Sequence, residues 1–271
     1  MHCLLIDLDG VLYEGEQSVD GATDVLVWLD EQAIPRLFVT NTTSRPRSAV
    51  AEKLAGMGMS VAATDIITPP VAAAHWLRDN VTGPAALFVP PATASEFAGI
   101  RLAEPGSSEP AGAVVIGDYG DRWTFDELNR AFRLLMMEPR PALVALGMTR
   151  YWRAPDGLRL DTASFVMALG HAADIEPVVL GKPAAHFFKA ALARLGMAAD
   201  QAFMIGDDIH TDIDAAQALG IRGILVKTGK FRPTDLDLEI RPCAALSSIA
   251  ALPNWWREEM AKAQDDESAS T

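Results

Sequence analysis

Met1-His2-Cys3-Leu4-Leu5-Ile6-Asp7-Leu8-Asp9-Gly10 opens the chain with a short apolar run that ends in two carboxylates one residue apart. An apolar run of this length predicts a buried strand. Because side chains alternate along a strand, we expect Asp7 and Asp9 on one face, about 6 to 7 Å apart. Two neighbouring acids at the end of a buried strand disfavour folding unless a cation or a reaction offsets their repulsion and lost hydration. An acidic turn explains the same residues, so this stretch alone leaves both interpretations open.

The composition is typical of a globular protein of one large domain or, as we prefer, two smaller ones. The 271 residues are 49% apolar and 22% charged, unlike disordered, fibrous or membrane chains. No apolar run reaches membrane-spanning length and no basic signal region opens the chain, so we expect a cytoplasmic protein. The formal net charge of -13 argues against nucleic acid or an anionic membrane as partner, but is compatible with a phosphorylated substrate.

The order of elements predicts an α/β protein with a Rossmann-like parallel sheet and a second α/β unit. Residues 20–33 have helical spacing and precede a strand over residues 36–40. From about residue 81, turn-forming residues separate short strands at residues 85–89, 113–117 and 142–147. Buried strands follow at residues 177–181, 202–205 and 223–226. We therefore expect a discontinuous core of residues 1–80 and 179–271, with residues 81–178 inserted as a separate α/β domain.

Polar side chains follow four of these strands, where ligands bind in open parallel sheets. They are, in chain order, Asp7 and Asp9, Thr40 and Asn41, Lys182, and Asp207 with Asp208 and Asp212. Carboxylates at this density, without a His or Cys cluster, favour magnesium over zinc. A hydroxyl, an amide and a lysine supply donors for an anion beside the metal, which together indicate a phosphoryl-transfer site. A polar loop that caps the next helix also explains the residues after Thr40, and both interpretations can hold.

A segment within the inserted domain interleaves cations with aromatic residues, Arg150-Tyr151-Trp152-Arg153. A solvated hairpin is the simpler interpretation. A substrate-recognition loop is the alternative, because aromatic and Arg residues are enriched at recognition surfaces. Arg150, Trp152 and Arg153 are therefore candidate substrate contacts. The two cysteines, Cys3 and Cys243, have no disulfide-framework spacing, so we expect both as small buried hydrophobic residues.

With four separated motifs in the right order, the chain resembles the haloacid dehalogenase (HAD) superfamily of phosphatases. The resemblance implies an HAD-like core in which Asp7 is the nucleophile, Asp9 the general acid and base, and Lys182 the cation bridging nucleophile and phosphoryl group. It implies Thr40 and Asn41 as phosphate ligands. It also implies a Mg²⁺ site formed by Asp7, Asp9 and Asp207, which Asp208 and Asp212 support indirectly or through water. The inserted α/β domain is similar to the type C2 cap of the type IIA branch.

The segments 179–183, 204–209 and 224–233, together with residues 150–153, are most similar to the phospholysine phosphohistidine inorganic pyrophosphate phosphatases. Close relatives in that subgroup often carry Ser where this chain has Asp9. Phosphoramidates and pyrophosphate need less leaving-group protonation than alkyl esters, so Asp9 is expected to extend the range toward oxygen monoesters. The resemblance further implies a small phosphorylated substrate and a homodimer formed through the cap.

Two other functions use the same residues. A phosphomutase or phosphotransferase keeps the aspartyl-phosphate and passes the phosphoryl group to an acceptor other than water. A non-catalytic magnesium-binding scaffold uses the cap to hold a protein partner. The scaffold is disfavoured because every catalytic residue is present in the chain.

Overall fold

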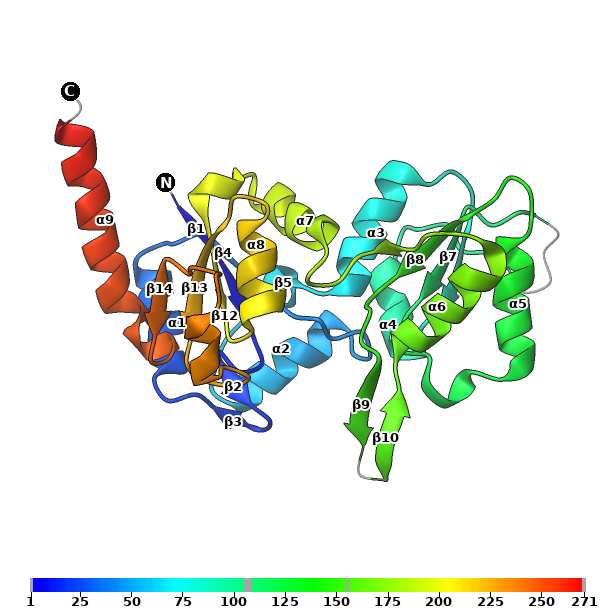
Figure 1. The fold of residues 1–271 in the computed structure, drawn as a ribbon, viewed down its shortest axis with the longest axis horizontal. Coiled ribbons are helices and arrows are strands. Elements are labelled where there is room, and N and C mark those ends of the chain that lie inside the picture. Colours follow the sequence, from blue (N-terminus) through cyan, green and yellow to red (C-terminus); the bar gives the residue numbers. More distant parts are fainter. Residues whose placement is uncertain (1, 105–108, 155, 270–271) are drawn as a thin grey trace. The chain divides into compact units, whose positions relative to one another are not determined.

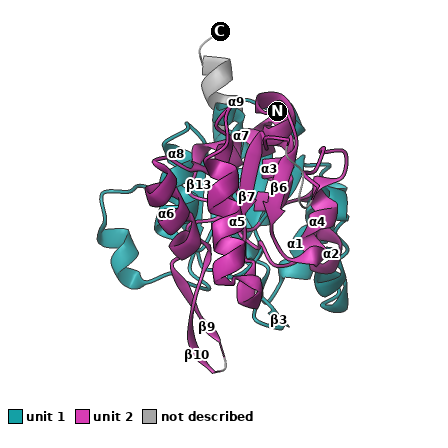
Figure 2. Cartoon of the chain, turned by 90° about the vertical axis from the view of Figure 1, so that its right-hand side faces the viewer, with its two compact units in different colours: residues 1–39, 51–65, 194–271 teal, residues 40–50, 66–193 magenta. Residues whose placement is uncertain are grey.

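The computed structural model describes residues 2–104, 109–154 and 156–269 (Figure 1). The chain folds into two compact units, drawn in different colours in Figure 2. The first contains residues 1–39, 51–65 and 194–271, and the second contains residues 40–50 and 66–193. Both units have parallel sheets with helices, which confirms the predicted α/β class.

The first unit has a parallel sheet with strands in the order β14-β13-β12-β1-β4. Within it, Ile6 lies opposite Ile205, and Asp7 lies opposite Val39. The strands are β1 (Cys3–Asp7), β4 (Arg36–Val39), β12 (Ala202–Gly206), β13 (Arg222–Val226) and β14 (Ala244–Leu246). A short hairpin, β2 (Tyr13–Glu14) with β3 (Gln17–Ser18), follows β1. The helices are α1 (Ala22–Glu31), α8 (Ala215–Gln217) and α9 (Leu252–Ala269), and α2 (Arg47–Gly56) runs across the division between the units.

The apolar run at the start of the chain forms a central strand of this sheet. Leu4, Leu5 and Ile6 are fully buried, and β1 pairs with a parallel strand on each side. A strand buried on both faces needs a continuous apolar run rather than alternation. This requirement explains why the sequence identified the strand correctly.

The second unit has a four-stranded parallel sheet in the order β11-β8-β7-β6. Its strands are β6 (Ala85–Phe88), β7 (Ala113–Ile116), β8 (Ala142–Ala145) and β11 (Val178–Val179). They match the predicted strands to within three residues at each end. The short strand β5 (Ile66–Ile67) and the helices α3 (Pro69–Asn80), α4 (Pro91–Ala94), α5 (Phe125–Leu135), α6 (Thr162–Ala173) and α7 (Ala185–Leu195) lie wholly or mainly in this unit.

Helix α3 accounts for the main difference between the units and the predicted domains. Its residues Ala73, Ala74 and Leu77 belong to one apolar cluster with Val115 of β7 and Val144 of β8. A separate apolar cluster contains residues of β7 and β8 together with residues of α5 and α6. Residues 66–80, like residues 40–50 and 179–193, belong to the second compact unit, although the sequence assigns them to the core. The domain boundaries at residues 81 and 178 stay a prediction.

The segment around Arg150 forms an antiparallel hairpin, β9 (Tyr151–Ala154) with β10 (Gly157–Leu160). Trp152 lies opposite Arg159, and Arg153 lies opposite Leu158. Because opposite residues share a face of a two-stranded sheet, Trp152 and Arg159 lie on one face, and Arg153 and Leu158 on the other. The hairpin interpretation is therefore confirmed.

Among all the residues that the structure describes, no helix is both long enough and apolar enough to cross a membrane.

The two cysteines differ in their surroundings. Cys3 is fully buried, as expected. Cys243 is exposed as a residue, which corrects the expectation for it. Its thiol nevertheless donates a hydrogen bond to the Gly223 carbonyl at 3.0 Å. Burial of the sulfur raises the pKa of the Cys243 thiol to about 11.

Alkylation of Cys243 should therefore be slow near neutral pH, because the thiolate is the reactive form. A pKa of about 11, against an ordinary 9.0, makes the thiolate fraction at pH 8 roughly 100-fold smaller. We expect iodoacetamide to modify Cys243 about 100-fold more slowly than N-acetylcysteine in the same tube, measured by peptide mass spectrometry. Equal rates would contradict the assigned surroundings. Both cysteines should react fully in denaturant.

Candidate active site

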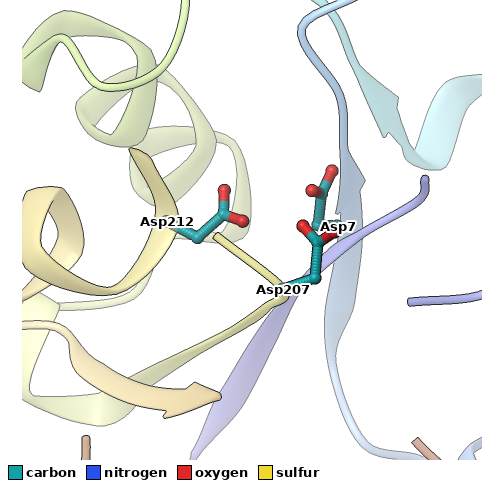
Figure 3. Close-up of side chains that lie close together, drawn as sticks. All are labelled: Asp7, Asp207 and Asp212. Atoms are coloured by element: carbon teal, nitrogen blue, oxygen red, sulfur yellow. The ribbon is translucent and has the colours of Figure 1, made fainter. Parts of the chain in front are cut away.

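Three carboxylates of the first unit lie close together: Asp7, Asp207 and Asp212 (Figure 3). One oxygen from each lies within 4.8 Å of the others. Asp7 is 6% exposed, Asp207 is 1% exposed and Asp212 is fully buried. The Leu8 amide donates to Asp7 Oδ1 at 2.8 Å, which helps to orient that carboxylate. Buried like charges at this spacing repel each other and favour a bound cation.

The parallel pairing of β1 with β12 brings these acids together. Asp7 is the last residue of β1, and Asp207 directly follows β12. Asp212 comes from the π-helical turn η5 (Ile209–Asp214) that follows. Asp208 caps this turn, since its Oδ1 accepts the amides of His210 at 3.1 Å and Thr211 at 3.0 Å. Asp208 thus supports the turn that presents Asp212.

Glycines make room for the acids. A β-carbon on Gly10 would lie 2.0 Å from Asp207 Oδ2, and one on Gly229 would lie 2.1 Å from the same oxygen. A β-carbon on Gly206 would lie 2.4 Å from the Asp212 side chain. Gly10 also has φ +83°, which disfavours any other residue. The sequence analysis did not predict this close approach of Gly10 to Asp207.

The loop after β13 contributes contacts that sequence reasoning missed. Thr228 Oγ1 donates to the Gly10 carbonyl, and the Lys230 amide donates to Asp207 Oδ2 at 2.7 Å. The Gly229 amide donates to Glu14 Oε1 at 2.6 Å. These residues follow a buried strand of the same parallel sheet, which is the signal that identified Asp207. The loop therefore ties Asp207 to the segment after β1.

The charges at this site affect Asp208 and Lys230 in opposite directions. The Lys230 ammonium lies 3.6 Å from Asp208 Oδ2. Burial raises the pKa of Asp208, but the backbone amides of Thr211 and His210 and the Lys230 charge outweigh it, so this pKa is lowered. Burial lowers the pKa of Lys230, but Asp207, Asp208, Asp7 and Asp212 outweigh it, so this pKa is raised. Both groups are therefore held in their charged forms.

Asp9 lies in different surroundings from Asp7. The strand ends at Asp7, and the Leu8 carbonyl accepts the Leu12 amide at 2.8 Å, so the chain turns at once. Asp9 therefore lies beyond the strand, in the turn, so strand alternation no longer supports the prediction of one shared face. Asp9 is exposed. Within the described ranges, the close carboxylate group consists of Asp7, Asp207 and Asp212, and the predicted role of Asp9 at the metal stays a prediction.

The predicted phosphate-binding residues lie in the second unit. The Asn41 amide group donates to the Lys182 carbonyl at 2.9 Å, and its Oδ1 accepts the Lys182 amide at 2.7 Å. Lys182 is 6% exposed and Thr40 is 8% exposed. Thr40 Oγ1 accepts the Thr42 amide at 3.3 Å. Asn41 thus holds the backbone of Lys182, a role that the sequence did not indicate.

The predicted recognition residues lie on or next to the β9–β10 hairpin. Trp152 is 42% exposed and lines a cavity of the second unit. Arg150 is exposed and its guanidinium lies 6.0 Å from the centre of the Tyr151 ring. Arg153 is exposed on the hairpin face opposite Trp152. Of the three, Trp152 is therefore the residue that a cavity of the described ranges supports as a recognition residue.

The donor set fits a hard divalent cation. Three buried carboxylates offer oxygen ligands, which suit Mg²⁺ or Ca²⁺. Neither His nor Cys belongs to the close group in the described part of the chain, which does not favour zinc. The nearby Asp208 carboxylate is already engaged in capping η5.

Known families match both ends of the chain. A haloacid dehalogenase-like hydrolase model matches residues 4–100. A HAD hydrolase-like model matches residues 179–252. The two matched segments include Asp7, Thr40 and Asn41 in the first, and Lys182, Asp207 and Asp212 in the second.

Relatives and solved structures agree with these matches. The phospholysine phosphohistidine inorganic pyrophosphate phosphatase of Xenopus laevis is 34% identical over 240 residues, covering 87% of this chain and 86% of the relative. A hypothetical protein from Pyrococcus horikoshii has a similar structure, with a TM-score of 0.85 and 25% identity, covering 94% of this chain and all of that one.

The glycerol phosphate phosphatase of Mycobacterium tuberculosis, solved in complex with calcium, has a TM-score of 0.79 and 31% identity. The match covers 93% of this chain and 74% of that one. The chain therefore belongs to the haloacid dehalogenase-like hydrolases, among members such as these phosphatases.

Proposed function

We propose that this hydrolase is a magnesium-dependent phosphatase that acts on small phosphorylated molecules through an aspartyl-phosphate. The grouping of Asp7 with Asp207 and Asp212 carries the proposal. In this grouping the candidate nucleophile, Asp7, lies beside the other ligands of a cation. That cation would attract the phosphoryl group to Asp7. The names of the phosphatase relatives support the reaction class.

Asp7 attacks the phosphorus in line with the leaving group, forming a new O–P bond while the bond to the leaving oxygen breaks. Asp9 gives its proton to that oxygen. Water then attacks the phosphorus of the aspartyl-phosphate, the O–P bond to Asp7 breaks, and Asp9 takes the proton from the water. The exposure of Asp9 suits this exchange of protons, and the turn after Leu8 separates it from the buried acids.

Asp7, Asp207 and Asp212 would hold the cation. When bound, Mg²⁺ neutralises charge on the phosphoryl oxygens and on these carboxylates. The buried Lys182 ammonium and the Thr40 hydroxyl are proposed to bind phosphoryl oxygens. Asn41 positions Lys182 through two backbone hydrogen bonds, and its second amide hydrogen can also meet phosphate. These assignments follow the motif positions of the family.

The substrate is proposed to be small. The names of similar proteins include phospholysine, phosphohistidine, pyrophosphate and glycerol phosphate, so both P–N and P–O bonds belong in a substrate screen. The homodimer through the cap and the cytoplasmic location stay predictions.

The nucleophile assignment predicts that Asp7→Asn lowers phosphate release at least about 1000-fold, because the amide cannot form the covalent intermediate. Phosphate release with Mg²⁺ should be measured over pyrophosphate, phosphoramidates, sugar phosphates, phosphoglycolate and p-nitrophenyl phosphate. Asp24→Asn, an exposed change on α1, is the matched control and should match wild type. Wild-type release by Asp7→Asn would refute the assignment. Turnover that requires an added acceptor would instead identify a phosphotransferase.

The role of Asp9 predicts a selective loss in Asp9→Ser. Turnover of alkyl phosphates should fall about 100-fold or more, since their leaving groups need a proton donor. Turnover of phosphoramidates and pyrophosphate should fall much less. The ratio of kcat/KM values for the two substrate classes measures this effect. Comparable turnover of alkyl phosphates by Asp9→Ser and wild type would overturn the role.

The packing of Gly10 predicts a metal-specific defect. Gly10→Ala adds a carbon against Asp207, whereas Gly15→Ala, at φ +60°, meets nothing within 4 Å. Both changes share a backbone strain of roughly 1 to 2 kcal/mol, so Gly15→Ala is the control. We expect Gly10→Ala to bind Mg²⁺ at least about tenfold more weakly by calorimetry, because its Asp207 is displaced. Equal affinities in the two variants would show that Asp207 is not a ligand.

A further inference from the structure

The second unit contains a cavity of about 420 Å³ beside the β9–β10 hairpin. Asp118, Asp121, Trp152, Arg159 and Phe165 line it. Asp118 lies two residues beyond the end of β7, Trp152 and Arg159 face it from the hairpin, and Phe165 belongs to α6. The cavity combines aromatic and acidic side chains from three separate elements.

The aromatic wall belongs to a stack of rings. Phe165 stacks on Trp123 with ring centres 4.9 Å apart, and Trp123 stacks on Phe88 at 5.4 Å. The Arg130 guanidinium lies 4.1 Å from the centre of the Phe88 ring. One end of the stack therefore already holds a cation, while the ring at its other end lines the cavity. Aromatic faces attract cations through their quadrupole.

The charges of the cavity leave one carboxylate uncompensated. Arg159 is engaged with acids: its Nη2 lies 2.7 Å from Asp156 Oδ2, and its Nη1 lies 3.6 Å from Asp121. Asp118 has no ion pair with Lys or Arg in the described ranges. Burial and the nearby Asp161 charge raise the pKa of Asp118, and the Gly120 amide only partly opposes them. A positive group placed beside Asp118 would offset both the cost of burying its carboxylate and its repulsion by Asp161.

We propose that this cavity binds an organic cation, an ammonium or imidazolium on an alkyl or aromatic body, with its charge at Asp118 and its body against Trp152 and Phe165. The proposal rests on two aromatic walls combined with an acid that has no Lys or Arg partner among the residues the structure describes. Phosphate-like anions are disfavoured because Arg159, the basic residue among the described ones that line the cavity, is already paired. The cation can come from the substrate itself or from a separate small molecule. Binding does not depend on the proposed function.

Calorimetry with the full chain tests the site directly. The probe is N-acetyl-lysine methylamide, and N-acetyl-norleucine methylamide is the neutral match. We expect the lysine probe to bind and the norleucine probe to bind at least about tenfold more weakly. Asp118→Asn should weaken the lysine probe at least about tenfold, and Trp152→Leu should weaken both probes. Asp126→Asn, an exposed acid on α5 of the same unit, is the matched control.

Three results would overturn the proposal: no binding of the lysine probe to wild type, equal binding of both probes, or unchanged binding in Asp118→Asn and Trp152→Leu. Circular dichroism establishes that both variants fold. Should Asp118→Asn unfold, the exposed Trp152 still provides the test, because its loss removes an aromatic wall.

Inhibition kinetics then separate the two sources of the cation. With p-nitrophenyl phosphate as substrate, competitive inhibition by the lysine probe indicates a cation that is part of the phosphorylated substrate. Inhibition or activation that changes kcat alone indicates a separate effector. If the enzyme releases no phosphate from any compound, the proposed function fails while the calorimetry still decides whether the cavity binds cations.

Discussion

The burial of three carboxylates within 4.8 Å of one another is the constraint on which the first unit depends. Removing each charge from water costs several kcal/mol, and the mutual repulsion adds to that cost. Such a group persists only where rigid elements hold it and a cation can share it. Strands β1 and β12 provide this rigidity, because their ends are fixed by parallel pairing with apolar neighbours buried around them. The charged edge and the apolar sheet are therefore interdependent.

Backbone contacts around the acids follow from the same constraint. Gly10 and Gly229 lie so close to Asp207 that neither leaves room for a β-carbon, and Asp207 accepts an amide from the loop after β13. Asp208 caps the π-helical turn that presents Asp212. Lys230 adds a positive charge at the edge of the group. Each contact reduces the freedom or the charge cost of an acid that would otherwise prefer water.

The sequence predicted the strands and most of the candidate site because both depend on local patterns. Fully buried parallel strands produce continuous apolar runs, and polar residues directly after them mark the ligand-binding edge. Asp7, Asp207, Asp212 and Lys182 were found in this way. The sequence did not predict three other features. They are the exposed position of Asp9, the hydrogen bonds of Asn41 to the Lys182 backbone, and the packing of α3 on the second sheet. These depend on a turn and on contacts between residues far apart in the chain, which periodicity does not encode.

The rule that located the first site also applies to the second sheet, where the sequence analysis used it for Lys182 but not for Asp118. Asp118 follows β7 and Lys182 follows β11, and since all four strands are parallel, both residues leave the sheet at the same edge. A lone Asp in a turn gave no signal of its own, because its significance depends on aromatic residues from β9 and α6. One edge of one sheet therefore carries a buried ammonium and a carboxylate for which the described residues offer no ion pair with Lys or Arg. A molecule with an anionic phosphoryl group at one end and an organic cation at the other matches both signs of charge on that edge.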